Sequence, residues 1–159
     1  MKRIIYTNPD TGLLILVTPA YGDPSRPDDE SEDAFLSRVI KGSVPEGIAY
    51  RMIDEGELPG DRYFRNQWRD TGTTVVVNMD KARIHHMGVI RAARDRELES
   101  LDVSFMRAVE TGNTGDQRLI TGRKQVLRDI PQVFDLSSRN DSPERLKQRW
   151  PENLERREG

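Results

Sequence analysis

Residues 78–131 read NMDKARIHHMGVIRAARDRELESLDVSFMRAVETGNTGDQRLITGRKQVLRDIP and contain one long and one shorter helical pattern. Apolar side chains recur in the first part at steps of three or four residues, the period of one helix face. This period predicts a helix from about Asp80 to about Thr111, well above the ~11–12 residues of an average helix. Such length favours packing against a second helix or another subunit. The apolar stripe is Ile84, Met87, Ile90, Leu98, Leu101, Phe105 and Val109, with Arg94 filling its gap.

A Gly-rich turn at residues 112–115 separates this helix from the next one. Thr114 followed by Gln117 fits a capping box, so the second helix is expected to begin there. Pro131 is expected to follow its last turn, because proline disfavours a continuing helix. The predicted apolar face is Leu119, Ile120, Val126, Leu127 and Ile130. A short turn between two apolar-striped helices predicts an antiparallel hairpin.

The preceding residues favour a small α+β unit. Residues 2–7 and 13–18 are rich in β-branched or apolar side chains and flank a turn signal, which predicts a β-hairpin. Residues 28–41 have acids in the first turn and Gly42 at the end, which predicts a helix. Further strands are expected at 48–54 and 73–77, while 62–68 fits either a helical turn or a loop.

The predicted fold class is therefore α+β, with a β-rich unit carrying one helix, followed by the helical hairpin. The expected domains are residues 1–77, residues 78–131 and a C-terminal extension at 132–159. Ser142 and Pro143 predict a short helix that runs toward Trp150 and ends before Pro151. A polar tail is expected from Asn153 onward.

Composition narrows the functional classes. Hydrophobic residues make up 35% and charged residues 33% of 159 residues, with a net charge of −2, so no global charge bias points to nucleic acid or an anionic membrane. The absence of cysteine excludes disulfides and thiolate metal sites. No apolar run approaches the ~18–20 residues of a membrane span or forms a signal peptide, so a soluble protein is expected.

No residue pattern in the sequence predicts catalysis, a cofactor or a metal. His85 and His86 are neighbours, so on a helix they point about 100° apart and do not chelate one ion together. They are expected on a solvated or partner-facing basic surface. The acids at 28–30 suit a helix N-terminus and lack the spacing of a calcium loop. Neither a phosphate-binding loop nor a nucleophile elbow is present, so an enzyme is not expected.

Basic residues crowd the predicted hairpin, but acidic residues are interleaved with them. This mixture favours a solvated or protein-facing surface over nucleic-acid binding. Arg94 lies on the apolar stripe, where a lone buried cation is costly. We expect it to pair across the hairpin, with Asp129 as the candidate, or to reach another chain. An arginine that extends past a narrow stripe into solvent is an equally good interpretation.

Two segments of the hairpin carry a family resemblance. They are Arg91-x-x-Arg94-Asp95-x-x-Leu98-x-x-x-Asp102 and the run RKQVLRDIP at residues 123–131, with Trp150-Pro151 as a late feature. Together they resemble the C-terminal module of tailed-bacteriophage tail assembly chaperones and tail fibre assembly proteins. The match covers about a third of the chain. It departs at the start of the second helix, where Arg123-Lys124 replaces Tyr-Arg, and in the first helix, which lacks the usual tryptophan.

The resemblance implies a phage origin and a role in tail or tail-fibre assembly or architecture, with no catalytic residues. Between these roles we expect a non-enzymatic virion structural protein of the tail or tail-fibre region, assembled in the host bacterial cytoplasm. The implied partners are other phage tail or fibre proteins and further copies of the chain. An assembly chaperone that leaves the virion is the alternative, and a small host-directed effector or nucleic-acid binder is a third hypothesis. The expected interaction residues are the seven stripe residues together with Arg94, Leu127, Arg128, Asp129, Ile130 and Trp150.

Overall fold

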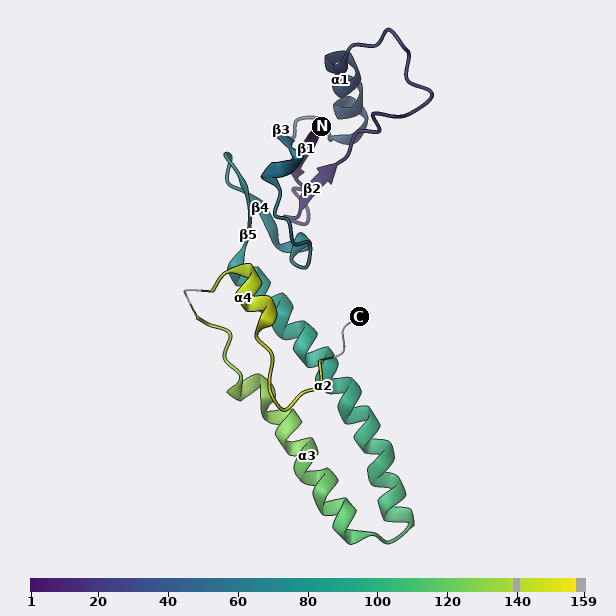
Figure 1. The fold of residues 1–159 in the computed structure, drawn as a ribbon, viewed down its shortest axis with the longest axis vertical. Helices are drawn as coiled ribbons and strands as arrows, with labels where there is room; N and C mark the ends of the chain where they lie inside the picture. Colours follow the sequence, from purple (N-terminus) through teal and green to yellow (C-terminus); the bar gives the residue numbers. More distant parts are fainter. Residues whose placement is uncertain (139–140, 157–159) are drawn as a thin grey trace. The chain divides into compact units, whose positions relative to one another are not determined.

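The computed structural model describes residues 1–138 and 141–156, and it is mixed α and β as predicted. The chain divides into two compact units, Met1–Asn78 and Met79–Gly159. The first holds a three-stranded and a two-stranded antiparallel sheet with one α-helix, and the second holds the helical hairpin (Figure 1). The predicted C-terminal extension belongs to the second unit, because the short α4 (Pro143–Gln148) packs on α2 (Met79–Glu110).

The first unit is built on a three-stranded sheet with the order β2-β1-β3. The strands β1 (Lys2–Thr7) and β2 (Leu14–Val17) form the predicted hairpin, and β3 (Tyr50–Asp54) pairs with the other edge of β1. The hairpin turn is closed by the Asn8 side chain, which accepts bonds from the backbone N–H groups of Asp10 and Thr11. The first strand of the chain therefore lies at the centre of the sheet.

Each face of this sheet covers a separate apolar cluster. On one face, Ile4 packs against Phe35 and Leu36 of α1 (Glu32–Ser43). On the other face, Ile5 and Ile53 pack against β4 (Trp68–Asp70) and β5 (Val75–Val77), which pair with one another. Alternate residues of a strand point to opposite faces, so the neighbours Ile4 and Ile5 serve both clusters.

Two boundaries in this unit differ from the prediction. The helix α1 begins at Glu32 rather than residue 28, because Ser31 is its N-cap and accepts a bond from the Ala34 N–H. The ambiguous segment 62–68 forms a short 3-10 turn, η2 (Arg65–Gln67), that leads into β4; a second 3-10 turn, η1 (Glu55–Glu57), follows β3. Arg51 of β3 and Asp70 of β4 form an ion pair at 2.6 Å.

The second unit confirms the hairpin of α2 and α3 (Thr114–Val133) (Figure 1). The turn uses Gly112 at φ 65°, a left-handed conformation that favours glycine. The N-cap of α3 is Asn113 rather than Thr114, because the Asn113 side chain accepts from the Asp116 N–H at 3.0 Å. The helix also continues past Pro131 to Val133. Proline in the last turn removes one backbone donor, while the Phe134 N–H still bonds to the Ile130 carbonyl at 2.8 Å.

The C-terminal segment buries more apolar side chains than the sequence predicted. Leu146 of α4 is fully buried, and Pro151 and Leu154 are also buried. The expectation of a polar tail from Asn153 is therefore wrong at Leu154, which is only 4% exposed. Residues 157–159 of that tail lie outside the described residues.

Candidate interaction surface of the helical hairpin

The inner face of the hairpin is small and tightly packed. Its α2 side is buried at Ala82, His86, Ile90 and Ala108, and its α3 side at Leu127 and Ile130. Two of the four buried α2 residues are alanines, whose small side chains allow neighbouring helices to approach closely. Of the predicted interaction residues, Ile90, Leu127 and Ile130 are thus used inside the unit, where they stabilise the hairpin itself.

Charged side chains of α3 form bonds with α2 and with the C-terminal segment. Arg123 donates to the Glu97 carboxylate on α2 and, at 2.6 Å, to the Asn153 carbonyl of the C-terminal segment. Lys124 pairs with Asp102 of α2, and its ammonium lies 5.4 Å from the centre of the Phe105 ring. Arg123 therefore connects three segments of the unit at one point, and these basic groups are engaged within the chain.

His86 occupies the base of the hairpin and is fully buried. Its Nε2 lies 2.7 Å from the Arg149 carbonyl oxygen, and its ring meets Trp150 edge-on at a centroid distance of 6.1 Å. Burial lowers the pKa of His86 from its ordinary value, since water no longer stabilises the charged ring, and nearby arginines lower it further. The expectation of a solvated basic face is wrong for this histidine: helix rotation turns His86 inward, whereas His85 is partly exposed.

Arg94 does not make the predicted contact across the hairpin. Its guanidinium pairs with the adjacent Asp95 at 2.8 Å, and its side chain is 19% exposed. Asp129 instead accepts a bond from the Gln125 amide at 2.8 Å, within α3. The long side chain of Arg94 extends away from the apolar stripe, and the carboxylate of the adjacent Asp95 balances its charge.

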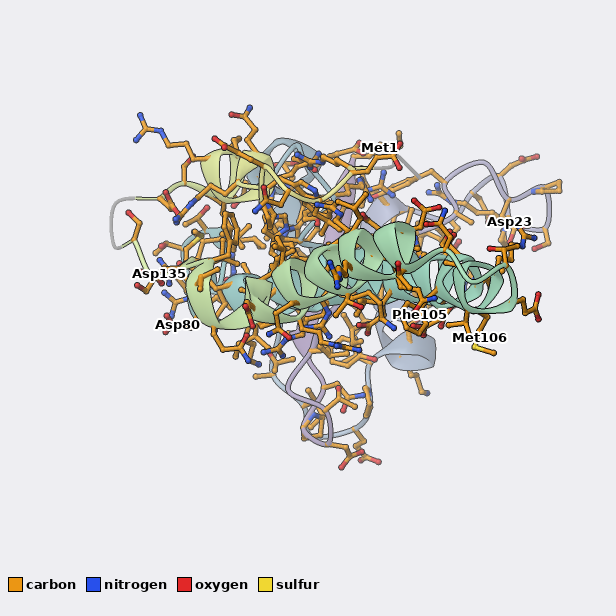
Figure 2. All side chains as sticks on the ribbon, turned by 90° about the horizontal axis from the view of Figure 1, so that it is seen from below. Met1, Asp23, Asp80, Phe105, Met106 and Asp135 are labelled. Carbon is orange, nitrogen blue, oxygen red and sulfur yellow. The ribbon has the colours of Figure 1, made fainter. Side chains whose placement is uncertain are left out.

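The remaining residues of the predicted site lie at varied depths on the hairpin. Ile84 is 76% exposed and Val109 is 46% exposed, so both ends of the apolar stripe face solvent. Partly buried positions are Met87, Leu98, Leu101, Phe105 and Trp150, and exposed charged positions are Arg128 and Asp129. Met106, which lies beside Phe105 and outside the predicted set, is also exposed (Figure 2).

Two residues of the predicted apolar face of α3, Leu119 and Val126, are exposed, and so is Val133, which was not part of that prediction. Leu119 is 74% exposed and Val126 is 42% exposed, as is Val133 at 75%. We call Leu119, Val126 and Val133 the α3 stripe. Positions seven apart share one edge of a helix, but Ile130 lies eleven residues, or about three turns, from Leu119 and is buried, so the spacing alone does not separate the exposed residues from the packed ones.

A shallow pocket of about 330 Å³ lies between α2 and the C-terminal segment. Its floor includes the small residues Ala92, Ala93 and Ser100, and Trp150 and Glu155 contribute to its wall. Glu97, the partner of Arg123, also lines it. The pocket therefore lies next to the contact between Arg123 and Glu97.

Over residues 1–138 and 141–156, no three histidine, aspartate or glutamate side chains gather as a metal site would require. Within the same residues, every helix is too short or too polar to traverse a bilayer. Comparisons of the chain with protein-family models, curated proteins and solved structures give no match.

Proposed function

We propose that this chain is a non-enzymatic structural component of a bacteriophage tail or tail fibre that acts through protein–protein contacts of its helical hairpin. The observation that carries the proposal is the exposure of apolar side chains along both helices. Ile84, Val109 and the α3 stripe remain exposed although the hairpin has a packed core. Regularly spaced exposed apolar residues on a helix are the anchors by which helices bind protein partners.

The chemistry of the polar residues supports an assembly role over catalysis. Acid–base catalysis needs a titratable group within reach of substrate. His86 is buried and its Nε2 bonds to a backbone carbonyl. Arg123 and Lys124 are paired with Glu97 and Asp102.

The phage context rests on the resemblance of residues 91–102 and 123–131. Within the second of these segments, Leu127 and Ile130 are buried while Arg128 and Asp129 are exposed. The resembling run therefore contains both core residues and surface charges, which suits a segment that packs inside the unit and contacts a partner outside it. The proposed location is the virion, after assembly in the host bacterial cytoplasm.

The test is mass spectrometry of purified phage particles, with the capsid protein as the stoichiometric reference. A structural component is expected at a fixed ratio to tail proteins in mature virions. If the chain is present in infected cells but absent from particles, the structural role fails.

The alternative, an assembly chaperone, would then be tested by co-expression with the tail fibre protein. A chaperone raises the yield of soluble fibre, and the matched control is the chain with Ile84→Glu and Leu119→Glu, which removes two exposed apolar anchors. Unchanged fibre solubility with and without the intact chain excludes that alternative.

A further inference from the structure

The outer edge of β3 carries backbone groups that no neighbouring strand pairs. In the sheet order β2-β1-β3, β3 is an edge strand and bonds only to β1. In an antiparallel pair, alternate residues direct their N–H and C=O groups toward the partner strand, and the residues between them direct these groups away from it. The contacts at one end of the β1–β3 pair show which residues of β3 point away.

Lys2 and Asp54 lie opposite each other at that end of the pair. The Lys2 N–H donates to the Tyr21 hydroxyl at 3.0 Å, and the Lys2 C=O accepts from the same hydroxyl at 3.1 Å. The Asp54 N–H donates to a carboxylate oxygen of Glu57 at 2.8 Å. The two backbones therefore do not bond to each other here, and the Asp54 backbone points away from β1.

The same direction holds for Met52 and Tyr50, which precede Asp54 in steps of two. Among the residues that the structure describes, no group bonds to the outward backbone of either one. Their side chains share the face of Ile4, yet Tyr50 is 49% and Met52 is 48% exposed. Unpaired groups on an edge strand form a template for another strand, and β3 contains no proline or lysine to block it.

An apolar pocket of about 440 Å³ opens beside Tyr50. Its lining includes Ile40 and Val44 from the end of α1, and Pro45 and Ile48 from the segment that leads to β3. A strand paired with this edge would carry a side chain next to the pocket. A flexible apolar side chain such as methionine suits an irregular pocket of this kind.

Two copies of β3 fit each other in an antiparallel register centred on Arg51. Tyr50 of one copy then pairs with Met52 of the other, because both lie one residue from the centre. Each outward N–H at these positions meets an outward C=O of the partner, so the open groups of both residues are satisfied. Met52 of each copy also lies beside Tyr50 of the other and therefore next to its pocket.

Shifted registers are less favourable because donors at both ends of the edge are already used. The Ile48 N–H donates to the Pro45 carbonyl at 3.2 Å, and the Asp54 N–H donates to Glu57 at 2.8 Å. A ladder displaced by one residue toward either end would need one of these donors. The open stretch of the edge is therefore short, and it matches the centred register.

The other face of the edge brings the two Arg51 side chains together, and both are compensated. Arg51 pairs with Asp70 at 2.6 Å and with Glu57 at 3.5 Å within its own chain. Each guanidinium therefore approaches the carboxylates of the second copy as well as its guanidinium. This mixture removes the penalty that two unpaired arginines in opposite positions would impose.

We propose that the outer edge of β3 binds the same edge of a second copy of this chain, in an antiparallel ladder centred on Arg51. The occupant is an extended strand, because an extended backbone presents donors and acceptors at the spacing of an open edge. A second copy supplies open groups, apolar side chains and compensated charges at matching positions. This surface lies in the first unit, so it is separate from the hairpin surface of the proposed function, and either can fail alone.

Proline substitution tests the ladder directly. Proline is tolerated in an edge strand where the lost N–H faces away from the sheet. Met52→Pro is therefore expected to keep the fold and to weaken dimerisation about tenfold or more, measured by sedimentation over a concentration series. Met52→Ala is the matched control: it keeps the N–H, so its dimer should be weakened less. Trp68 fluorescence reports whether the first unit is folded.

Cysteine crosslinking tests the register, because the chain contains no cysteine. A mixture of Tyr50→Cys and Met52→Cys is expected to form a mixed disulfide under mild oxidation. Residues paired in this way have Cα atoms about 5.5 Å apart, within the ~7 Å that a disulfide allows. Met52→Cys alone should crosslink more slowly, since its two copies lie diagonally, about 7–8 Å apart. Leu13→Cys, an exposed position of the same unit, is the control.

Each outcome supports or overturns the proposal. A wild-type chain that sediments as a monomer at every concentration overturns it, and so does a folded Met52→Pro variant with an unchanged dimer. If Met52→Pro unfolds the first unit, Met52→Lys decides instead, because a lysine on the edge should weaken the dimer without removing a bond of the sheet. Faster crosslinking of Met52→Cys with itself than with Tyr50→Cys would overturn the register. Equal crosslinking of Leu13→Cys would overturn the choice of edge.

Discussion

Replacement of His86 by alanine should destabilise the helical unit far more than replacement of any exposed hairpin residue. The variant leaves the Arg149 carbonyl without its 2.7 Å bond, and an unsatisfied buried acceptor costs about 1–3 kcal/mol. It also removes the edge-on contact with Trp150, worth about 0.5–1.5 kcal/mol. The expected total is about 1.5–4.5 kcal/mol, a large part of the ~5–15 kcal/mol that stabilises an ordinary domain.

The same residue should make the helical unit sensitive to acid. The pKa of folded His86 is lowered by burial, so the folded state holds the neutral ring while the unfolded chain protonates at the ordinary histidine pKa of about 6.5. Its stabilising contribution is therefore complete above about pH 6.5 and is lost as the pH falls toward the folded pKa. The slope for one proton reaches at most about 1.4 kcal/mol per pH unit.

The two tryptophans allow this effect to be measured in one unit at a time. Trp68 lies in the first unit and Trp150 in the second. In a Trp68→Phe background, the fluorescence of Trp150 reports urea unfolding of the helical unit alone. Unfolding free energies measured from pH 7.5 to pH 5 should fall in the wild-type sequence and fall less in His86→Gln, which keeps a donor without titrating.

His85→Gln is the matched control, because it removes the neighbouring and partly exposed histidine. Its unfolding free energy should still fall with acid more than that of His86→Gln, because the buried His86 remains. Equal pH profiles for the wild-type sequence and His86→Gln would refute the reasoning. So would a loss of stability in His86→Ala no larger than that in Ile84→Ala, whose side chain is 76% exposed.

Three further predictions concern packing, turn geometry and an ion pair. Leu127→Ala, at a fully buried position, should cost about 2–5 kcal/mol by urea unfolding followed through Trp150; a loss below about 1 kcal/mol would contradict its place in the core. Gly112→Ala should cost about 1 kcal/mol in thermal unfolding, since φ is 65° there, whereas Gly122→Ala, where an added Cβ meets no atom within 4 Å, should stabilise α3 by up to about 1 kcal/mol. Asp70→Asn should remove the ion pair with Arg51, which stabilises the first unit at pH values above the ordinary aspartate pKa. Bonding to Arg51 lowers the pKa of Asp70, so that contribution is lost as acid protonates the carboxylate; identical acid unfolding of both proteins would exclude it.

The elements that could be predicted from the sequence are those with strong local signals. The α2 helix is long and periodic, so the hairpin followed from the spacing of apolar residues and the glycine turn. The first residue of α3 could not be predicted in the same way. Asn113 and Thr114 are both good N-caps, and only the backbone geometry selects Asn113. Likewise, Pro131 sits in a last turn that tolerates it, which a local rule for proline does not reveal.

The candidate site was harder to predict because it depends on contacts distant in sequence. His86 is buried by a segment 63 residues later in the chain, and no residue near position 86 predicts that contact. Arg94 satisfies its charge with the adjacent Asp95, a choice that depends on side-chain rotamers. Leu119 and Val126 are apolar, as core residues are. Only the way α3 is rotated against α2 shows that Leu127 is buried while these two residues are exposed.

The central place of β1 in its sheet has a consequence for how the chain acquires its structure during synthesis. Every strand of the first unit lies within Met1–Asn78, so this unit has all its pairing partners before α2 is made. The helical unit, by contrast, is complete only when Arg149 bonds to His86 and Asn153 bonds to Arg123. Until then His86 lacks the cover that Arg149 and Trp150 supply, so termination before residue 149 should give a chain with an ordered first unit and an aggregation-prone second one.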